Sequence, residues 1–316
     1  MIRFIAMRLL LMAWVIVGAT ILICLIIRLA PGDASLLIAM ARHGGIDQVS
    51  KAEIETIRRS EAIGGPFVVQ YGKWLHHALH GDLGCSLVDG KPVLTEILRR
   101  FPATLQLAAA SLFIALLIAI PAGLLSASHP NSLFDHIGLS VALVGVSMPN
   151  FWLGLLLISL FSVHLGWLPV FGTGGINHLI LPALTVGTGA AALTTRLTRS
   201  SIIDTLGCNY IRTARAKGLP ERVVIGKHAL KNALIPIITM VGLQFAFLLE
   251  GAVIVETIFA WPGIGRLLVE AIFSRDYAML QGCALFMAIV FSLVNLAVDM
   301  FSAWLDPRIR YERKRA

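Results

Sequence analysis

The chain has 316 residues, of which 57% are hydrophobic and 14% are charged, and its formal net charge is +8. Soluble domains carry roughly 25% charged residues, so this composition and the mean hydropathy of +0.81 exclude an ordinary soluble enzyme. We therefore expect an all-α polytopic protein embedded in a lipid bilayer. The basic residues are dispersed and no soluble domain carries them, so nucleic acid is not an expected partner.

Six apolar runs are long enough to cross a bilayer, which takes about 20 residues per helix. They lie at about residues 9–29, 103–127, 137–163, 179–198, 233–256 and 281–304. The third run contains Pro149 and Asn150. A proline inside a helix removes a backbone hydrogen bond, so we expect a kink there.

The placement of lysine and arginine predicts the orientation. With the N terminus inside, the cytoplasmic side holds most of the basic residues, namely Arg3, Arg8, those from Arg196 to Lys231 and those from Arg308 to Arg315. The short outer loops then hold only Arg266 and Arg275. We expect both termini in the cytoplasm.

These spans divide the chain into an N-terminal helix (1–30), an outer segment (31–102), a five-helix core (103–304) with a cytoplasmic loop (209–231), and a basic tail (305–316). The outer segment is too long for a plain connector, so we expect it to pack over the outer mouth. Its stretches VSKAEIETIRRSEA (49–62) and YGKWLHHALH (71–80) favour helices.

Three histidines, His76, His77 and His80, fall close together in the second of these stretches. Helical spacing brings His80 near the other two, and imidazole suits nickel or zinc. A wet helix face explains them equally well, so we predict no metal site and leave their role open.

The loop at 209–231, NYIRTARAKGLPERVVIGKHALK, predicts two short helices at an angle. Gly218 suits the left-handed end of one helix, and Pro220 suits the first turn of the next. Such a knuckle can insert into a groove on a partner and transmit a rigid-body push. The alternative is a basic amphipathic segment lying on anionic lipid.

This loop resembles the cytoplasmic coupling loop of bacterial ABC import permeases. Arg212, Thr213 and Ala214 stand in the place of the EAA triplet of that family, with Gly218 at the family spacing. Arg212 replaces the acidic residue of the triplet, and the stretch from His228 to Lys231 departs from the I-x-LP that usually follows. Both departures are typical of the peptide/nickel branch.

Further motifs of the same branch run along nearly the whole chain in the right order. They include RLAPGD (28–33), GDLGCS (81–86), GVSMPNFWLG (145–154), VETIFAWPGIGR (255–266) and LDPRIRY (305–311). The chain resembles the B-type permease subunit of dipeptide, oligopeptide, glutathione or nickel importers, which are type I and binding-protein-dependent. The resemblance implies that an ATPase is contacted by Arg212, Thr213, Ala214, Arg215, Ala216, Lys217, Gly218, Leu219, Pro220 and His228.

Residues of the translocation pathway are suggested by polar or kinked positions within spans. Ser147, Met148, Pro149 and Asn150 either line a pathway or form a packing kink. Acidic groups in spans are costly unless they face a pathway or a partner, so Glu250 and Glu256 join the pathway candidates, with helix–helix hydrogen bonding as the alternative. Trp261 is expected at the membrane interface.

The chain has no GxxxxGK[ST] motif, so we expect it to bind no cofactor and to be no enzyme. The resemblance implies a bacterial inner-membrane complex with a second homologous permease, two ATPase subunits that use ATP and Mg²⁺, and an extracytoplasmic binding protein. Cargo stays open between peptides and nickel or metal chelates. The alternative function is a channel or secondary transporter that works without ATPases.

Overall fold

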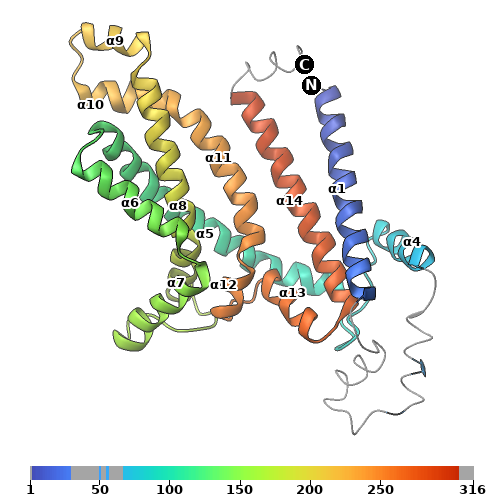
Figure 1. Cartoon of the computed structure of the whole chain (residues 1–316). Coiled ribbons are helices and arrows are strands. Elements are labelled where there is room, and N and C mark those ends of the chain that lie inside the picture. Colours follow the sequence, from blue (N-terminus) through green and yellow to red (C-terminus); the bar gives the residue numbers. More distant parts are fainter. Residues whose placement is uncertain (1, 30–49, 51–54, 57–66, 306–316) are drawn as a thin grey trace. The chain divides into compact units, whose positions relative to one another are not determined.

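The computed structural model describes residues 2–29, 50, 55–56 and 67–305 (Figure 1). The stretch expected to be helical at 49–62 lies mostly outside these residues, and the tail after Leu305 lies wholly outside them. The long helices are α1 (Ile2–Leu29), α5 (Val93–Ser128), α8 (Ile176–Leu206), α11 (Leu230–Gly251) and α14 (Tyr277–Leu305). Shorter helices are α4 (Phe67–Leu79), α6 (Leu133–Ser147), α7 (Asn150–Leu157), α9 (Asn209–Ala216), α10 (Glu221–Val223), α12 (Val253–Ile258) and α13 (Ile264–Phe273), with π-helical η2 (Ile158–His164) and η3 (Val224–Ala229).

Five helical stretches of the described chain are long and apolar enough to cross a membrane. They are Ala6–Ile27, Val93–Ser128, Ile176–Leu206, Glu221–Leu249 and Tyr277–Ser302. A sixth candidate is the pair Asp135–Gly145 and Asn150–His164, which is bent by 101° at a short break. If the bent pair is one span, the number agrees with the six that the sequence predicts.

The break in the bent pair lies where the sequence predicts it. α6 ends at Ser147, Met148 is extended with φ −80° and ψ 123°, and Pro149 caps the start of α7. A proline pushes the residue before it out of the helical region, which explains the extended Met148. The helix is thus interrupted at Pro149, and the change of direction is larger than a simple kink.

Helix α5 begins at Val93, well before the predicted edge near residue 103. Its first turns carry charges that argue against a membrane span, but Glu96 pairs with Arg99 and Arg100 at helical spacing. Such pairs support a helix. The helix therefore extends beyond the apolar run used to predict its edge.

The chain folds as two compact units, one formed by residues 1–104 and 262–292 and the other by 105–261 and 293–316. In the first unit, Val93, Ile97, Ile264 and Cys283 belong to one buried apolar cluster. In the second, α8 packs closely on α5: a Cβ at Gly123 would lie 2.6 Å from Thr198 Cβ. Small residues at helix contacts are usual in membrane proteins, because they let backbones approach closely.

Candidate functional site: the loop between α8 and α11

The loop after α8 has the broken shape that its sequence predicts. α9 ends at Ala216, and Gly218 takes φ +75°, a left-handed conformation that favours glycine. Pro220 follows with φ −65° and ψ 143° and caps α10. One expectation is wrong: the second helix is not short. Residues Glu221–Leu249 form one continuous helical stretch, which accommodates both Gly226 and Pro236.

One face of α9 is fixed by an apolar cluster. Ile211 and Ala214, three positions apart and therefore on one helix face, pack with Val224 and Ala229 of η3, and Leu206 of α8 lies against them. Nearby, Asn232 Nδ2 donates a hydrogen bond to Tyr210 Oη at 2.9 Å. The loop is consequently a folded extension of the helices on either side of it.

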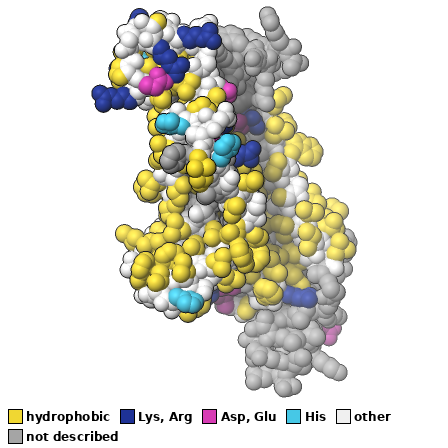
Figure 2. All heavy atoms as spheres, turned by 60° about the vertical axis from the view of Figure 1, so that its left-hand side comes forward, with side chains coloured by type: hydrophobic (Ala, Val, Ile, Leu, Met, Phe, Trp, Pro, Cys, Tyr) yellow, Lys and Arg dark blue, Asp and Glu magenta, His cyan; other side chains and the backbone are white. Residues whose placement is uncertain are grey.

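The remaining face of the loop is exposed and basic. Most of the residues that the family resemblance assigns to coupling are exposed. They are Arg212, Thr213, Arg215, Ala216, Lys217, Gly218, Leu219 and Pro220. Ala214 is buried in the apolar cluster and so supports the loop from within, while His228 is half-buried. Figure 2 shows lysine and arginine side chains gathered over α9 and α10, with hydrophobic side chains dominating the surface below.

An ion pair closes the turn between α9 and α10. Arg215 Nη2 lies 2.6 Å from Glu221 Oε1, and Arg215 Nε lies 3.2 Å from Glu221 Oε2. The hydrogen bond to Glu221 raises the pKa of Arg215 above its ordinary value. Exposed pairs contribute little to stability, so this one is best described as a link between the two sides of the turn.

The residues around the α6–α7 break lie at the surface of the isolated chain. Ser147, Pro149 and Asn150 are exposed and Met148 is half-buried. Asn150 Oδ1 lies on the side of α8, 3.6 Å from where a Cβ would stand at Gly189. These positions are open to a pathway or a partner chain. The side chain of Glu250 falls outside the described residues.

Two residues expected at a pathway or an interface are buried instead. Glu256 has 0% of its surface exposed and Trp261 has 3%. The chain folds back after α12, so that Trp261 N donates to Glu256 O at 2.8 Å, with Ala260 at φ +50° between them. The burial of Glu256 favours the structural alternative, and the expectation of Trp261 as an interfacial anchor is wrong.

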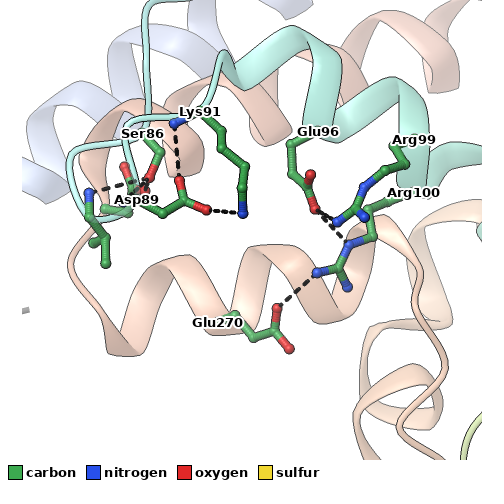
Figure 3. A network of polar contacts seen from close by, with 9 residues as sticks. Ser86, Asp89, Lys91, Glu96, Arg99, Arg100 and Glu270 are labelled. Carbon is green, nitrogen blue, oxygen red and sulfur yellow. Dashed lines mark hydrogen bonds and ion pairs between the residues drawn. The ribbon is translucent and has the colours of Figure 1, made fainter. Parts of the chain in front are cut away.

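A polar network that the sequence did not predict lies in the first unit (Figure 3). Glu96 Oε1 accepts hydrogen bonds from Arg99 Nη2 at 2.5 Å and Arg100 Nε at 2.9 Å. Arg100 also reaches Glu270 of α13 at 3.6 Å, and Glu270 accepts from Arg266 at 2.8 Å. The network connects the start of α5 to α13.

The turn before α5 is held by its own hydrogen bonds, also drawn in Figure 3. Asp89 Oδ2 accepts from Lys91 Nζ at 2.7 Å, and Ser86 Oγ accepts from Asp89 N at 3.1 Å. Burial of Asp89 opposes its ionisation, but hydrogen bonds from Lys91 and Ser86 outweigh burial and hold the pKa of this carboxyl below its ordinary value. Ser86 Oγ in turn donates to Asp276.

His76 and His77 of α4 are exposed, as is His80 directly after this helix. The rings of His76 and His80 are 4.6 Å apart, and His80 Nδ1 lies 2.8 Å from the carbonyl oxygen of His76. Within the described residues, no three His, Cys, Asp or Glu side chains are grouped to hold a metal ion.

Residues 119–311 match the family described as "Binding-protein-dependent transport system inner membrane component". The chain belongs to this family. The permease is 41% identical over 312 residues to the glutathione transport system permease protein GsiC of Salmonella typhi, a match that covers 99% of this chain and 100% of the relative. GsiC of Escherichia coli strain K12 is 42% identical over 293 residues, covering 93% and 94%.

Solved structures share the fold of the permease. The inward-facing MetNI methionine ABC transporter matches with a TM-score of 0.57 and 17% identity over 66% of this chain and 96% of that chain. An amino acid ABC transporter with histidines matches with a TM-score of 0.52 and 15% identity over 74% and 98%. At these identities the likeness concerns the fold.

The chain is therefore the permease subunit of an ABC importer and a multi-pass inner membrane protein. This family membership implies ATPase and binding-protein partners, and the permease itself is a translocation component rather than an enzyme. A channel or secondary transporter that works without ATPases is not favoured.

Proposed function

We propose that the permease imports glutathione or similarly small peptides across the inner membrane. The observation that carries this proposal is the 41% identity to GsiC, which extends over 99% of the permease. That relative is described as a glutathione transport system permease protein. The other cargo class suggested by the sequence motifs is a nickel or metal chelate.

We further propose that the loop at 209–231 docks on an ATPase subunit. The exposed face of α9 and α10 carries Arg212, Lys217 and Arg222, while Glu221 is engaged by Arg215. A groove that receives this face has to present acidic side chains, because an apolar or basic groove would leave these cations desolvated and uncompensated. Leu219, 37% exposed at the tip, supplies an apolar contact for the centre of such a groove.

In this arrangement a second, homologous permease completes the pathway, and two ATPases grip the two cytoplasmic loops. The exposed Ser147, Pro149 and Asn150 would face the pathway or the second permease. ATP and Mg²⁺ are bound by the ATPases, and both termini of this permease lie in the cytoplasm. ATP-driven closure of the ATPases rocks the permease pair, and hydrolysis resets it.

To test the cargo, the permease is purified together with its co-encoded subunits, and the complex is reconstituted into liposomes. ATPase activity is measured as the binding protein is added after loading with glutathione, with a dipeptide, with a longer peptide, or with a Ni²⁺ chelate. Stimulation by the glutathione-loaded or peptide-loaded protein alone supports the proposal. Stimulation confined to the nickel-loaded protein would contradict the proposed cargo and leave the importer assignment intact.

A further inference from the structure

A buried carboxylate at the start of α6 is used by nothing described so far. Asp135 is 1% exposed. It forms a two-point ion pair with Arg199 of α8, with Nε–Oδ1 at 2.6 Å and Nη2–Oδ2 at 2.7 Å. It also accepts hydrogen bonds from Ser126 Oγ of α5 and, at 2.9 Å, from the backbone N–H of Asn131.

These contacts join three helices of the second unit at one point. Ser126 is near the end of α5, Asp135 is in the first turn of α6, and Arg199 is on α8. One residue before Arg199, Thr198 packs against Gly123 of α5, where a Cβ would lie 2.6 Å away. The ion pair therefore adds α6 to an α5–α8 contact that is already tight.

The same segment of α8 leads directly to the loop. Arg199 is followed by Ile202, which packs with Ala127 of α5 and Ala233 of α11, and then by Leu206, which packs on both that cluster and the loop cluster around Ile211. From Arg199 to Leu206 the helix advances about 10 Å at 1.5 Å per residue. A continuous line of packed side chains thus runs from the ion pair to α9.

Stability alone is a weak reason for this arrangement. Removing a carboxylate such as that of Asp135 from water has a desolvation cost, and well-packed apolar residues often replace such ion pairs without loss of stability. A bidentate guanidinium–carboxylate pair does supply a fixed relative orientation of the two groups, which apolar contacts do not.

We propose that Asp135 and Arg199 are positioning residues for ATP-driven transport. Their pair makes the end of α8, the loop and α6 move as one body. A displacement imposed on the loop by an ATPase then reaches Ser147 and the break at Pro149, because α6 runs without interruption from Leu133 to Ser147. This inference rests on the proposed docking of the loop on an ATPase.

The first test separates orientation from mere folding by comparing variants in the reconstituted complex. Asp135→Asn with Arg199→Met removes both charges together, so no buried charge is left unpaired. Arg199→Lys keeps the charge but loses the two-point geometry. We expect both to assemble to within twofold of the unmodified complex, and the stimulation of ATPase activity by loaded binding protein to fall at least fivefold per assembled complex. Asp89→Asn, in an exposed pair on an outer turn, is the matched control and should leave stimulation unchanged.

The proposal would be overturned if loaded binding protein stimulated the ATPase activity of the assembled double variant as strongly as that of the unmodified complex. If the double variant does not assemble, Arg199→Lys decides the question, and parent-like stimulation in that variant would overturn it as well. Failure of the docking proposal looks different, because the ATPase of the unmodified complex would then make no contact with the loop at 209–231.

The second test measures the shared motion directly. Spin labels are attached at Cys208 and at a cysteine introduced by Leu133→Cys, because both positions are exposed. Cys85→Ser removes the other exposed cysteine among the described residues. In the assembled complex the label–label distance should stay the same when ATP and Mg²⁺ are added. With Arg199→Lys the distance should shift or broaden on ATP addition. A distance that changes equally in both proteins would contradict movement as one body.

Discussion

Gly187 of α8 lies directly against the backbone carbonyl of Ser111 in α5, so that a Cβ at position 187 would stand 2.7 Å from that oxygen. Both partners are helix backbone, and neither can give way as a flexible side chain can. Gly187→Ala should therefore destabilise the folded permease by about 1–3 kcal/mol, even though alanine in a helix is worth up to about 1 kcal/mol more than glycine. The apparent melting temperature of the solubilised complex measures this loss.

The control for this substitution is Gly138→Ala in α6, where a Cβ would meet nothing within 4 Å. This variant should match or slightly exceed the parent in melting temperature. A Gly187→Ala variant as stable as the control would mean that α5 and α8 are not in close contact at this point.

Gly218→Val should disturb the loop through its backbone alone. The site has open space around it, but φ is +75°, a conformation that costs a β-branched residue about 1–3 kcal/mol. We expect the loop to rearrange while the transmembrane helices stay folded. Transport and the amount of ATPase subunit that co-purifies with the permease should both fall several-fold. Gly218→Asn, which tolerates the left-handed region better, should retain more activity, and full transport by Gly218→Val would refute a required loop shape.

Lys217→Glu should weaken association with the ATPase if the receiving groove is acidic. We expect the affinity for the ATPase to fall roughly tenfold, equivalent to about 1.4 kcal/mol. Raising the salt concentration should weaken the unmodified complex more than it weakens the variant complex. Titration of the detergent-solubilised permease with its purified ATPase measures the affinity. Lys73→Glu, an exposed charge reversal on α4, serves as the control. Affinity that instead follows the anionic lipid content of vesicles, with no ATPase effect, would favour a lipid-binding loop.

Asn150→Leu should reduce transport without reducing assembly. Asn150 is exposed at the start of α7. Its side chain therefore makes no buried hydrogen bond whose loss would destabilise the fold. Uptake of labelled cargo per assembled complex is the measurement, and we expect a loss of several-fold. Parent-like uptake would favour the interpretation of this segment as a packing kink.

Asp276→Ala should loosen the junction between α14 and the turn before α5. The Asp276 carboxylate accepts a hydrogen bond from Ser86 Oγ. It also accepts hydrogen bonds from Leu87 N and Met279 N, each with a length of 3.1 Å. Leaving these buried donors unsatisfied costs about 1–3 kcal/mol. The melting temperature should fall by more than it does for Asp89→Ala, whose partner Lys91 is exposed and can be solvated. Equal effects of the two substitutions would argue against the buried clamp.

Features set by local backbone chemistry could be predicted from the sequence. The break at Pro149, the left-handed turn at Gly218 and the helix after Pro220 follow from what proline and glycine permit, whichever residues surround them. The membrane spans follow from runs of apolar residues in the same way.

Features that join distant parts of the chain could not be predicted. Asp135 and Arg199 are separated by 64 positions, and neither helical periodicity nor charge spacing indicates that they meet. Trp261 is chemically suited to an interface, yet a backbone reversal after α12 buries it. Helix α5 also begins earlier than its apolar run indicates, because Glu96 pairs with Arg99 and Arg100 in its first turns.

The central claim is that the loop at 209–231 of this permease contacts an ATPase, and cross-linking tests it most directly. Thr213→Cys, in a Cys85→Ser, Cys208→Ser background, is treated with a thiol-to-amine cross-linker in the assembled complex, with Lys91→Cys in the turn before α5 as control. We predict a permease–ATPase product from position 213 and none from position 91. Co-purification of the ATPase without any product from position 213, or equal products from both positions, would contradict the account.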